Sequence, residues 1–151
     1  MRFRIPALLP DAYAAVETLD DFVATLGLEP ELLDLVRTRA SQLNGCAYCV
    51  DLHSRDLRTR GETDQRLWAI AVWREAPFFT PRERAALAWT EAVTLIAEHR
   101  PSDALYAEVR AQLDEREIAA LTLAIVAVNT WNRLSIASGL VPSERREAVG
   151  V

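Results

Sequence analysis

Apolar side chains recur every three or four residues along most of this chain, which is the spacing of one face of an α-helix. Residues 11 to 26 show the pattern first, and Gly27 predicts the end of that helix. A second helix is predicted from Pro30, which suits a first helical turn, to Asn44, where Asn44 and Gly45 interrupt the pattern. The beginning of the chain is therefore predicted to be helical.

The remaining residues carry the start and stop signals of further helices. Residues 46 to 60 form one predicted helix with Gly61 as its cap, and another runs from residue 63 or 64 to about residue 74. Thr80, Pro81 and Glu83 combine a capping box with a proline at the first helical position, and open a helix to about residue 99. Two more helices are predicted to begin at residues 101–102 and 114–117. With no strand alternation, repeat or long linker, the pattern predicts a single all-α domain of about six to seven helices over residues 1 to 151.

The stretch IAALTLAIVAV, residues 118 to 128, contains only Thr122 as a polar member. A helix with no polar face is expected to be buried nearly all round. The stretch is too short for a bilayer, which needs about 20 residues. Two interpretations follow, a central core helix or a helix shared with a subunit interface, and both can hold together.

Composition limits the classes of partner. The 151 residues carry a net charge of -5 and contain no basic run, which disfavours nucleic acid and membrane surfaces as partners. The apolar residues near the N-terminus are interrupted by Pro6 and Pro10 before a signal-peptide core can form. We therefore expect a cytoplasmic protein, in a compartment where cysteines are more often catalytic, redox-active or metal-binding than structural.

Both cysteines and one of the two histidines lie within NGCAYCVDLH, residues 44 to 53. If Asn44 caps the helix that follows, Cys46, Cys49 and His53 fall at i, i+3 and i+7, on one helical face. The i,i+3 spacing places the two cysteine Cα atoms about 5 Å apart, within the disulfide range. The stretch therefore predicts a redox dithiol.

The two thiols are expected to be activated in different ways. The helix N-terminus favours a thiolate at Cys46, whereas His53 can accept the proton of Cys49. This division suits a cycle in which one sulfur is oxidised to a sulfenic acid and the other condenses with it to a disulfide.

Other interpretations of the cysteines remain open. A CxxC sequence also occurs in inert buried helices and in zinc sites. Structural zinc usually needs four ligands, so Asp51, Asp56 or the distant His99 would have to complete the set. His99 lies near a predicted helix end, where interaction with terminal carbonyls is the simpler role. Thioredoxin-like chemistry is disfavoured, because its CxxC belongs to a βαβ pattern.

The run DLVRTRASQLNGCAYCVDLHSRDLRTRGETDQRL, residues 34 to 67, resembles the core motif of the AhpD-like alkylhydroperoxidases within the carboxymuconolactone decarboxylase superfamily. Residues 73 to 94 and 129 to 138 also resemble downstream segments of a small-protein branch of that family. The resemblance implies an all-helical AhpD-like fold, a homo-oligomer (trimer or hexamer) and a thiol peroxidase. Its substrate would be a hydroperoxide, its reductant an unidentified dithiol or reductase, and it would need no cofactor and no metal.

Carried over by position, the resemblance makes Cys49 the peroxide-attacking thiol, Cys46 the resolving thiol and His53 the proton-relay residue. The family glutamate of this relay is replaced by Asp34, which is one methylene shorter. Tyr48 stands where the hydroperoxidase has a histidine, and a phenol with a pKa near 10 is a poor base at neutral pH. A simpler interpretation stays open for each residue. Tyr48 would be a packing residue, and Asp34 would be a solvated carboxylate.

Asn129 and Asn132 follow the apolar run, and two interpretations stay open for them: they line the site, or they are interior amides that require hydrogen-bond partners. Two classes of function are predicted. The first is an enzyme, a peroxidase or disulfide oxidoreductase in antioxidant defence. The second is a non-enzymatic oligomeric redox sensor or binding protein of the same fold. Lactone decarboxylation, a third activity of the superfamily, is less favoured because that branch does not rely on a CxxC pair.

Overall fold

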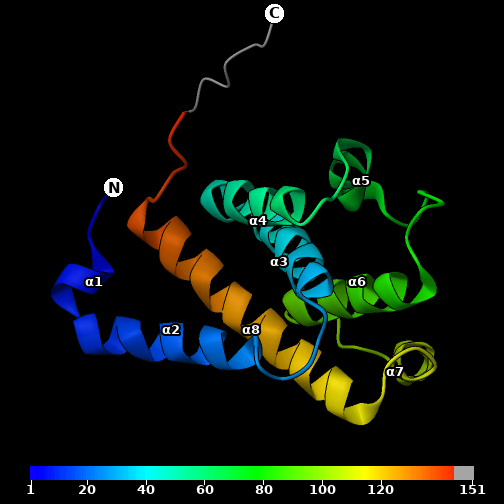
Figure 1. Ribbon diagram of the computed structural model, residues 1–151. Coiled ribbons are helices and arrows are strands. Elements are labelled where there is room, and N and C mark those ends of the chain that lie inside the picture. Colours follow the sequence, from blue (N-terminus) through cyan, green and yellow to red (C-terminus); the bar gives the residue numbers. More distant parts are fainter. Residues whose placement is uncertain (145–151) are drawn as a thin grey trace, which may run out of the picture.

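The computed structural model describes residues 1–144, which form eight α-helices and one short 3-10 helix, η1, with no strand among them (Figure 1). In chain order the elements are α1 (Ile5–Leu8), α2 (Pro10–Val23), α3 (Pro30–Asn44), α4 (Ala47–Thr59), α5 (Asp64–Ala69), η1 (Ile70–Val72), α6 (Pro81–Thr94), α7 (Asp103–Arg110) and α8 (Glu115–Ser138). The predicted all-α class is confirmed. The predicted helix count was too low because the short α1 carries no periodic pattern of its own.

The strongest predicted helix start is confirmed at α6. The Thr80 hydroxyl accepts the backbone N–H of Glu83, and the Glu83 carboxylate accepts the N–H of Thr80, which completes the capping box. Helix ends were predicted less well. The helix predicted to run to about residue 99 is α6, which ends at Thr94, and the helix predicted to run to about residue 74 is divided into α5 and η1. Ile70 and Trp73 are still buried, because a spacing of three residues also suits a 3-10 turn.

Helix α3 lies at the centre of the molecule, in contact with α4, α6 and α8. It buries Leu32, Leu33, Leu35 and Val36, so apolar side chains point to more than one neighbouring helix. The polar Asp34 is buried among them. In Figure 1, α8 crosses the molecule diagonally, with α2 against it and α3 and α6 beside it.

Helix α8 is not buried nearly all round, which corrects the expectation for residues 118 to 128. Leu123 and Val126 are 42% and 46% exposed, while Leu121, Ala124 and Ile125 are fully buried. The neighbouring helices cover only part of the circumference of α8, so an apolar strip remains at the surface. Within residues 1–144, no helix combines the length and the apolar character that crossing a membrane requires.

Candidate functional site

The cysteine pair lies where α3 ends and α4 begins. Gly45 takes a left-handed conformation with φ 71°, and the N–H of Cys46 donates to the Ser41 carbonyl at 3.0 Å, so the chain turns sharply. Cys46 is the N-cap of α4, because its Sγ accepts the N–H of Cys49 at 3.3 Å. The prediction that Asn44 caps this helix was wrong, since α3 continues through Asn44.

Cys46 and Cys49 are joined by a disulfide, with their Cα atoms 5.3 Å apart. The spacing expected from the sequence is confirmed. Both residues are almost fully buried, at 1% and 3% exposed. A molecule that reacts with either sulfur must therefore approach through an opening in the surface.

A network of amide groups holds this turn against α8. Asn44 Nδ2 donates to Asn129 Oδ1 at 3.0 Å and to Asn132 Oδ1 at 2.8 Å. Asn132 Nδ2 in turn donates to Ser41 Oγ at 3.0 Å. Asn129 and Asn132 do not line the cavity beside Cys49. Both side-chain oxygens accept from Asn44 and so fix the end of α3, which sets the start of α4.

His53 lies one turn after Cys49 on α4, and both residues line the same cavity. His53 Nδ1 is buried and has no hydrogen-bond partner within residues 1–144; Asp56 Oδ2 lies 3.8 Å away. Burial and, secondarily, the charge of Arg37 lower the pKa of His53 to about 4, against an opposing effect of Asp20. His53 is therefore neutral at pH 7 and able to accept a proton.

Asp34 reaches the same region from α3. Its side chain is buried, and Oδ2 accepts a hydrogen bond from Arg60 Nε at 2.7 Å while Oδ1 lies 3.4 Å from Arg37 Nη1. The interpretation of Asp34 as a solvated carboxylate is therefore wrong. Its negative charge is held in the interior by two guanidinium groups, as buried charges require.

One group of three side chains within residues 1–144, Asp34, His53 and Asp56, places a potential metal-ligand atom from each within 4.8 Å of the others. Neither cysteine nor His99 belongs to it, so the ligand set considered for zinc is not assembled. The two guanidinium groups on Asp34 put positive charge beside this group, which disfavours a bound cation.

A cavity of about 540 Å³ opens beside Cys49, between α2 and α4. Tyr48 lines it from α4, Tyr13 from α2 and Trp131 from α8. The rings of Tyr13 and Trp131 meet edge to face, with centroids 5.1 Å apart. This aromatic wall makes the cavity suitable for an apolar molecule.

The family model described as "Carboxymuconolactone decarboxylase family" matches residues 10–92, more than half of the chain. This chain belongs to the carboxymuconolactone decarboxylase family. An uncharacterised protein of Bacillus subtilis, YdfG, is 38% identical over 87% of this chain and 90% of its own length. A crystal structure from Agrobacterium tumefaciens, ATU0492, is 40% identical, covers 95% of this chain and 99% of its own, and has a TM-score of 0.91.

ATU0492 is described as a protein of unknown function, provisionally the antioxidant defence protein AhpD, so the fold of this family member is AhpD-like. The debrominase Bmp8 has the same fold, with a TM-score of 0.80 and 20% identity over 89% of this chain and 73% of its own. At that identity the likeness concerns the fold alone. A fold does not determine a reaction, so the reaction depends on the side chains of this family member.

The cavity also contains residues that the sequence interpretation missed. Glu17, Asp20 and Asp21 line it from α2, and Arg37 joins Asp20 to the site through an ion pair of 2.8 Å. The i,i+3 spacing of Asp34 and Arg37 is a signal that could have predicted one of these contacts. The carboxylates of α2 gave no such signal, because α2 approaches α4 only in the folded chain.

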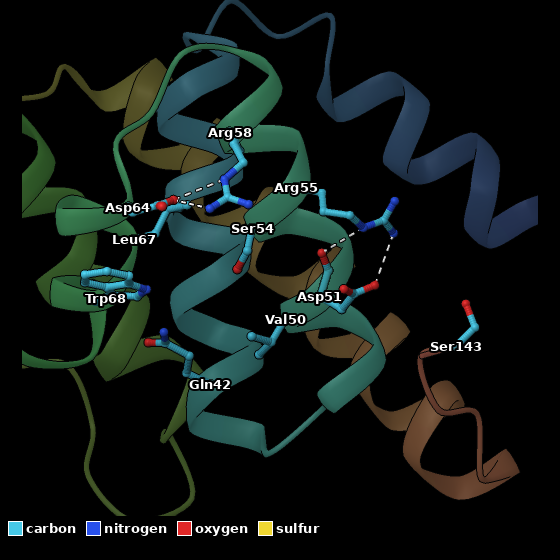
Figure 2. Close-up of a pocket in the computed structure, with 10 residues that line it drawn as sticks. All are labelled: Gln42, Val50, Asp51, Ser54, Arg55, Arg58, Asp64, Leu67, Trp68 and Ser143. Atoms are coloured by element: carbon cyan, nitrogen blue, oxygen red, sulfur yellow. Dashed lines mark hydrogen bonds and ion pairs between the residues drawn. The ribbon is translucent and has the colours of Figure 1, made fainter. Parts of the chain in front are cut away.

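A larger hollow of about 740 Å³ lies on another face of α4 (Figure 2). Its charged side chains are paired with each other: Arg58 Nε donates to Asp64 Oδ1 at 3.1 Å, and Arg55 Nη2 lies 3.3 Å from Asp51 Oδ2. Neither cysteine lines this hollow, nor does His53. The smaller cavity beside Cys49 is therefore the candidate active site of this family member.

Proposed function

We propose that this protein is a thiol peroxidase of antioxidant defence, in a cytoplasm that keeps thiols reduced, where it reduces hydroperoxides with Cys49 and Cys46 and is regenerated by a dithiol. One observation carries the proposal: a disulfide between buried cysteines beside a cavity that also contains a neutral histidine on the same helix. The AhpD-like fold supports it.

The cycle begins with the reduced protein. His53 accepts the proton of the Cys49 thiol, and the resulting thiolate attacks one oxygen of the hydroperoxide. The O–O bond breaks, the attacked oxygen stays on sulfur as a sulfenic acid, and the other oxygen leaves as an alcohol with the proton from His53. Two electrons pass from sulfur to the peroxide.

Cys46 completes the oxidation. Its thiol attacks the Cys49 sulfur, an S–S bond forms, the S–O bond breaks, and the hydroxyl leaves with the thiol proton as water. The Cα separation of 5.3 Å means that α4 need not unwind for this step. An external dithiol then reduces the disulfide by exchange and leaves as a disulfide itself.

We assign Asp34 and Asp56 positioning roles around His53. Asp34 pairs with Arg37 and so offsets part of the positive charge that lowers the pKa of His53, and the Asp56 carboxylate lies 3.8 Å from Nδ1. Since Nδ1 is the buried ring nitrogen, Nε2 is the atom available on the cavity side. Tyr48 contributes part of the cavity wall.

The test is turnover. The reduced protein, with dithiothreitol as reductant, should consume many equivalents of hydroperoxide per chain, and mass spectrometry should show an intramolecular disulfide formed by loss of two hydrogen atoms. Cys49→Ser is the control that removes the attacking sulfur. A disulfide that forms once without turnover would favour the non-enzymatic redox sensor. Free thiols that survive excess peroxide would overturn both functions.

We also propose that the protein is a homo-oligomer, a trimer or hexamer. The apolar strip on α8, with Leu123, Val126 and Ile136, and the indole of Trp68, which is 77% exposed, are surfaces that a second copy would cover. Light scattering at low micromolar concentration tests this. A mass near 16.9 kDa, that of one chain, would contradict it.

A further inference from the structure

We propose that the cavity beside Cys49 selects by charge, accepting neutral or cationic aromatic hydroperoxides and rejecting those that carry a carboxylate. This inference rests on the proposed peroxidase function and adds a substrate class to it. It rests on the charge of one wall of that cavity.

That wall belongs to α2 and is acidic. Glu17, Asp20 and Asp21 share one face of the helix and line the cavity, at spacings of three, four and one residues. Asp20 is paired with Arg37 at 2.8 Å, whereas no ion pair is recorded for Glu17 or Asp21 within the described chain. Two carboxylates therefore face the cavity without a compensating charge.

No cation is available to offset them. Among the described residues that line the cavity there is no arginine, and His53 is neutral. Arg37 lies nearby, but its guanidinium is already shared between Asp20 and Asp34. A carboxylate on the substrate would thus lose water and meet the carboxylates of Glu17 and Asp21 without a lining side-chain cation to pair with.

The other walls favour an aromatic substrate. Tyr13, Tyr48 and Trp131 surround the cavity with ring surface, and such rings also attract cations. Burial and the negative charge of Glu17 raise the pKa of Tyr13, so its hydroxyl stays neutral at pH 7. The rings and carboxylates together form a site for apolar or positively charged groups.

One arginine close by could reverse this selection. Arg4 lines a smaller hollow of about 210 Å³ that shares Tyr13 and Trp131 with the cavity. It lies outside the group of residues that line the cavity itself. An anionic substrate that used Arg4 would be preferred rather than rejected, so Arg4 has to be part of the test.

The experiment uses cumene hydroperoxide with a carboxylate, a methyl ester or a trimethylammonium group at the para position. Pre-reduced protein is mixed with each peroxide, and the second-order rate of Cys49 oxidation is measured in a single turnover, relative to the reaction of the same peroxide with free dithiothreitol. At low ionic strength we expect the ester and the cation to react about tenfold faster than the carboxylate. The cation is more polar than the ester. A fast reaction of both would therefore show that the charge of the substrate, and not its hydrophobicity, sets the rate.

Two further measurements sharpen the result. Added salt should shrink the preference, since it screens charges in a cavity open to solvent. The double variant Glu17→Gln, Asp21→Asn should speed the carboxylate several-fold and leave the ester within about twofold. The double variant Asp103→Asn, Glu108→Gln, which also removes two carboxylates but from the exposed surface of α7, is the matched control and should alter none of the rates.

A negative result distinguishes between the proposed peroxidase function and the inference about substrate charge. If no peroxide oxidises Cys49, the proposed function falls and the inference falls with it. If all three peroxides react at equal normalised rates, or if the double variant leaves the carboxylate slow, the inference alone is overturned. A carboxylate that reacts fastest, and loses that advantage in Arg4→Gln, would overturn it in favour of anion recruitment.

Discussion

Two faces of α4 differ in how their polar groups are satisfied. On the face toward α2, Cys49 and His53 are buried, and Nδ1 of His53 has no hydrogen-bond partner within residues 1–144. On the face shown in Figure 2, arginines and aspartates pair with one another around an open hollow. The first face keeps a proton acceptor beside a reactive sulfur, whereas the second consists of charges that neutralise each other.

The larger of the two hollows is therefore not the one that contains the reactive groups. The hollow of about 740 Å³ presents paired charges, and the cavity of about 540 Å³ presents a disulfide and a histidine with a lowered pKa. Perturbed titratable groups in a concave site are the better indication of function. The following variants test this contrast, in order of decreasing effect.

Cys49→Ser should reduce peroxide consumption to the level of buffer, because the other thiol, Cys46, is buried and does not line the cavity. Cys46→Ser should leave the first oxidation intact and let a sulfenic acid accumulate at Cys49, detectable with a dimedone probe by mass spectrometry. The opposite pattern, a sulfenic acid on Cys46 in Cys49→Ser, would exchange the two roles.

His53→Gln should slow alkylation of Cys49 at pH 7 by up to about 30-fold, because a thiol that returns to its free pKa of about 8.5 is only about 3% ionised at this pH. Iodoacetamide trapping over a pH series measures the change. Ser54→Ala, the next residue on α4 and part of the hollow in Figure 2, is the control with no expected effect. Equal rates in both variants would remove His53 from the relay.

The stability of the oxidised protein should depend on pH through His53. Its pKa is about 4 when folded and about 6.5 in the unfolded chain, so the unfolded chain binds the proton first as the pH falls. The free energy of unfolding should thus decrease between about pH 6.5 and pH 4, by up to about 3 kcal/mol from this residue. Urea denaturation should show the decrease in the wild type and not in His53→Gln; identical pH profiles would refute it.

Asp56→Asn should slow Cys49 alkylation about fivefold, because the carboxylate 3.8 Å from Nδ1 stabilises the protonated imidazole. Asp34→Asn should have a smaller effect on this rate, since both oxygens of Asp34 already interact with arginines. Alkylation rates at pH 7, with Ser54→Ala as reference, measure the order. The reverse order would make Asp34 the direct partner of His53.

Much of the fold could be predicted because its signals are local. The capping box of Thr80 and Glu83 involves residues three positions apart, so it does not depend on the rest of the chain. The same holds for Cys46 and Cys49, whose Cα separation is a property of one helical turn. Helix ends such as that of α6 were harder to predict, because apolar periodicity continues into turns that pack on the same core.

The environment of the cysteines depended on the tertiary structure. Asp34 became a buried charge because Arg60, 26 positions later, donates to it, and Asn44 became part of a network because α8 lies beside it. The acidic wall of the cavity exists because α2 folds next to α4. The helices and the reactive pair follow from the amino-acid sequence alone, because their contacts lie within one or two turns. The charges, rings and cavity around that pair depend on the folded chain, because those contacts join segments that are distant along the sequence.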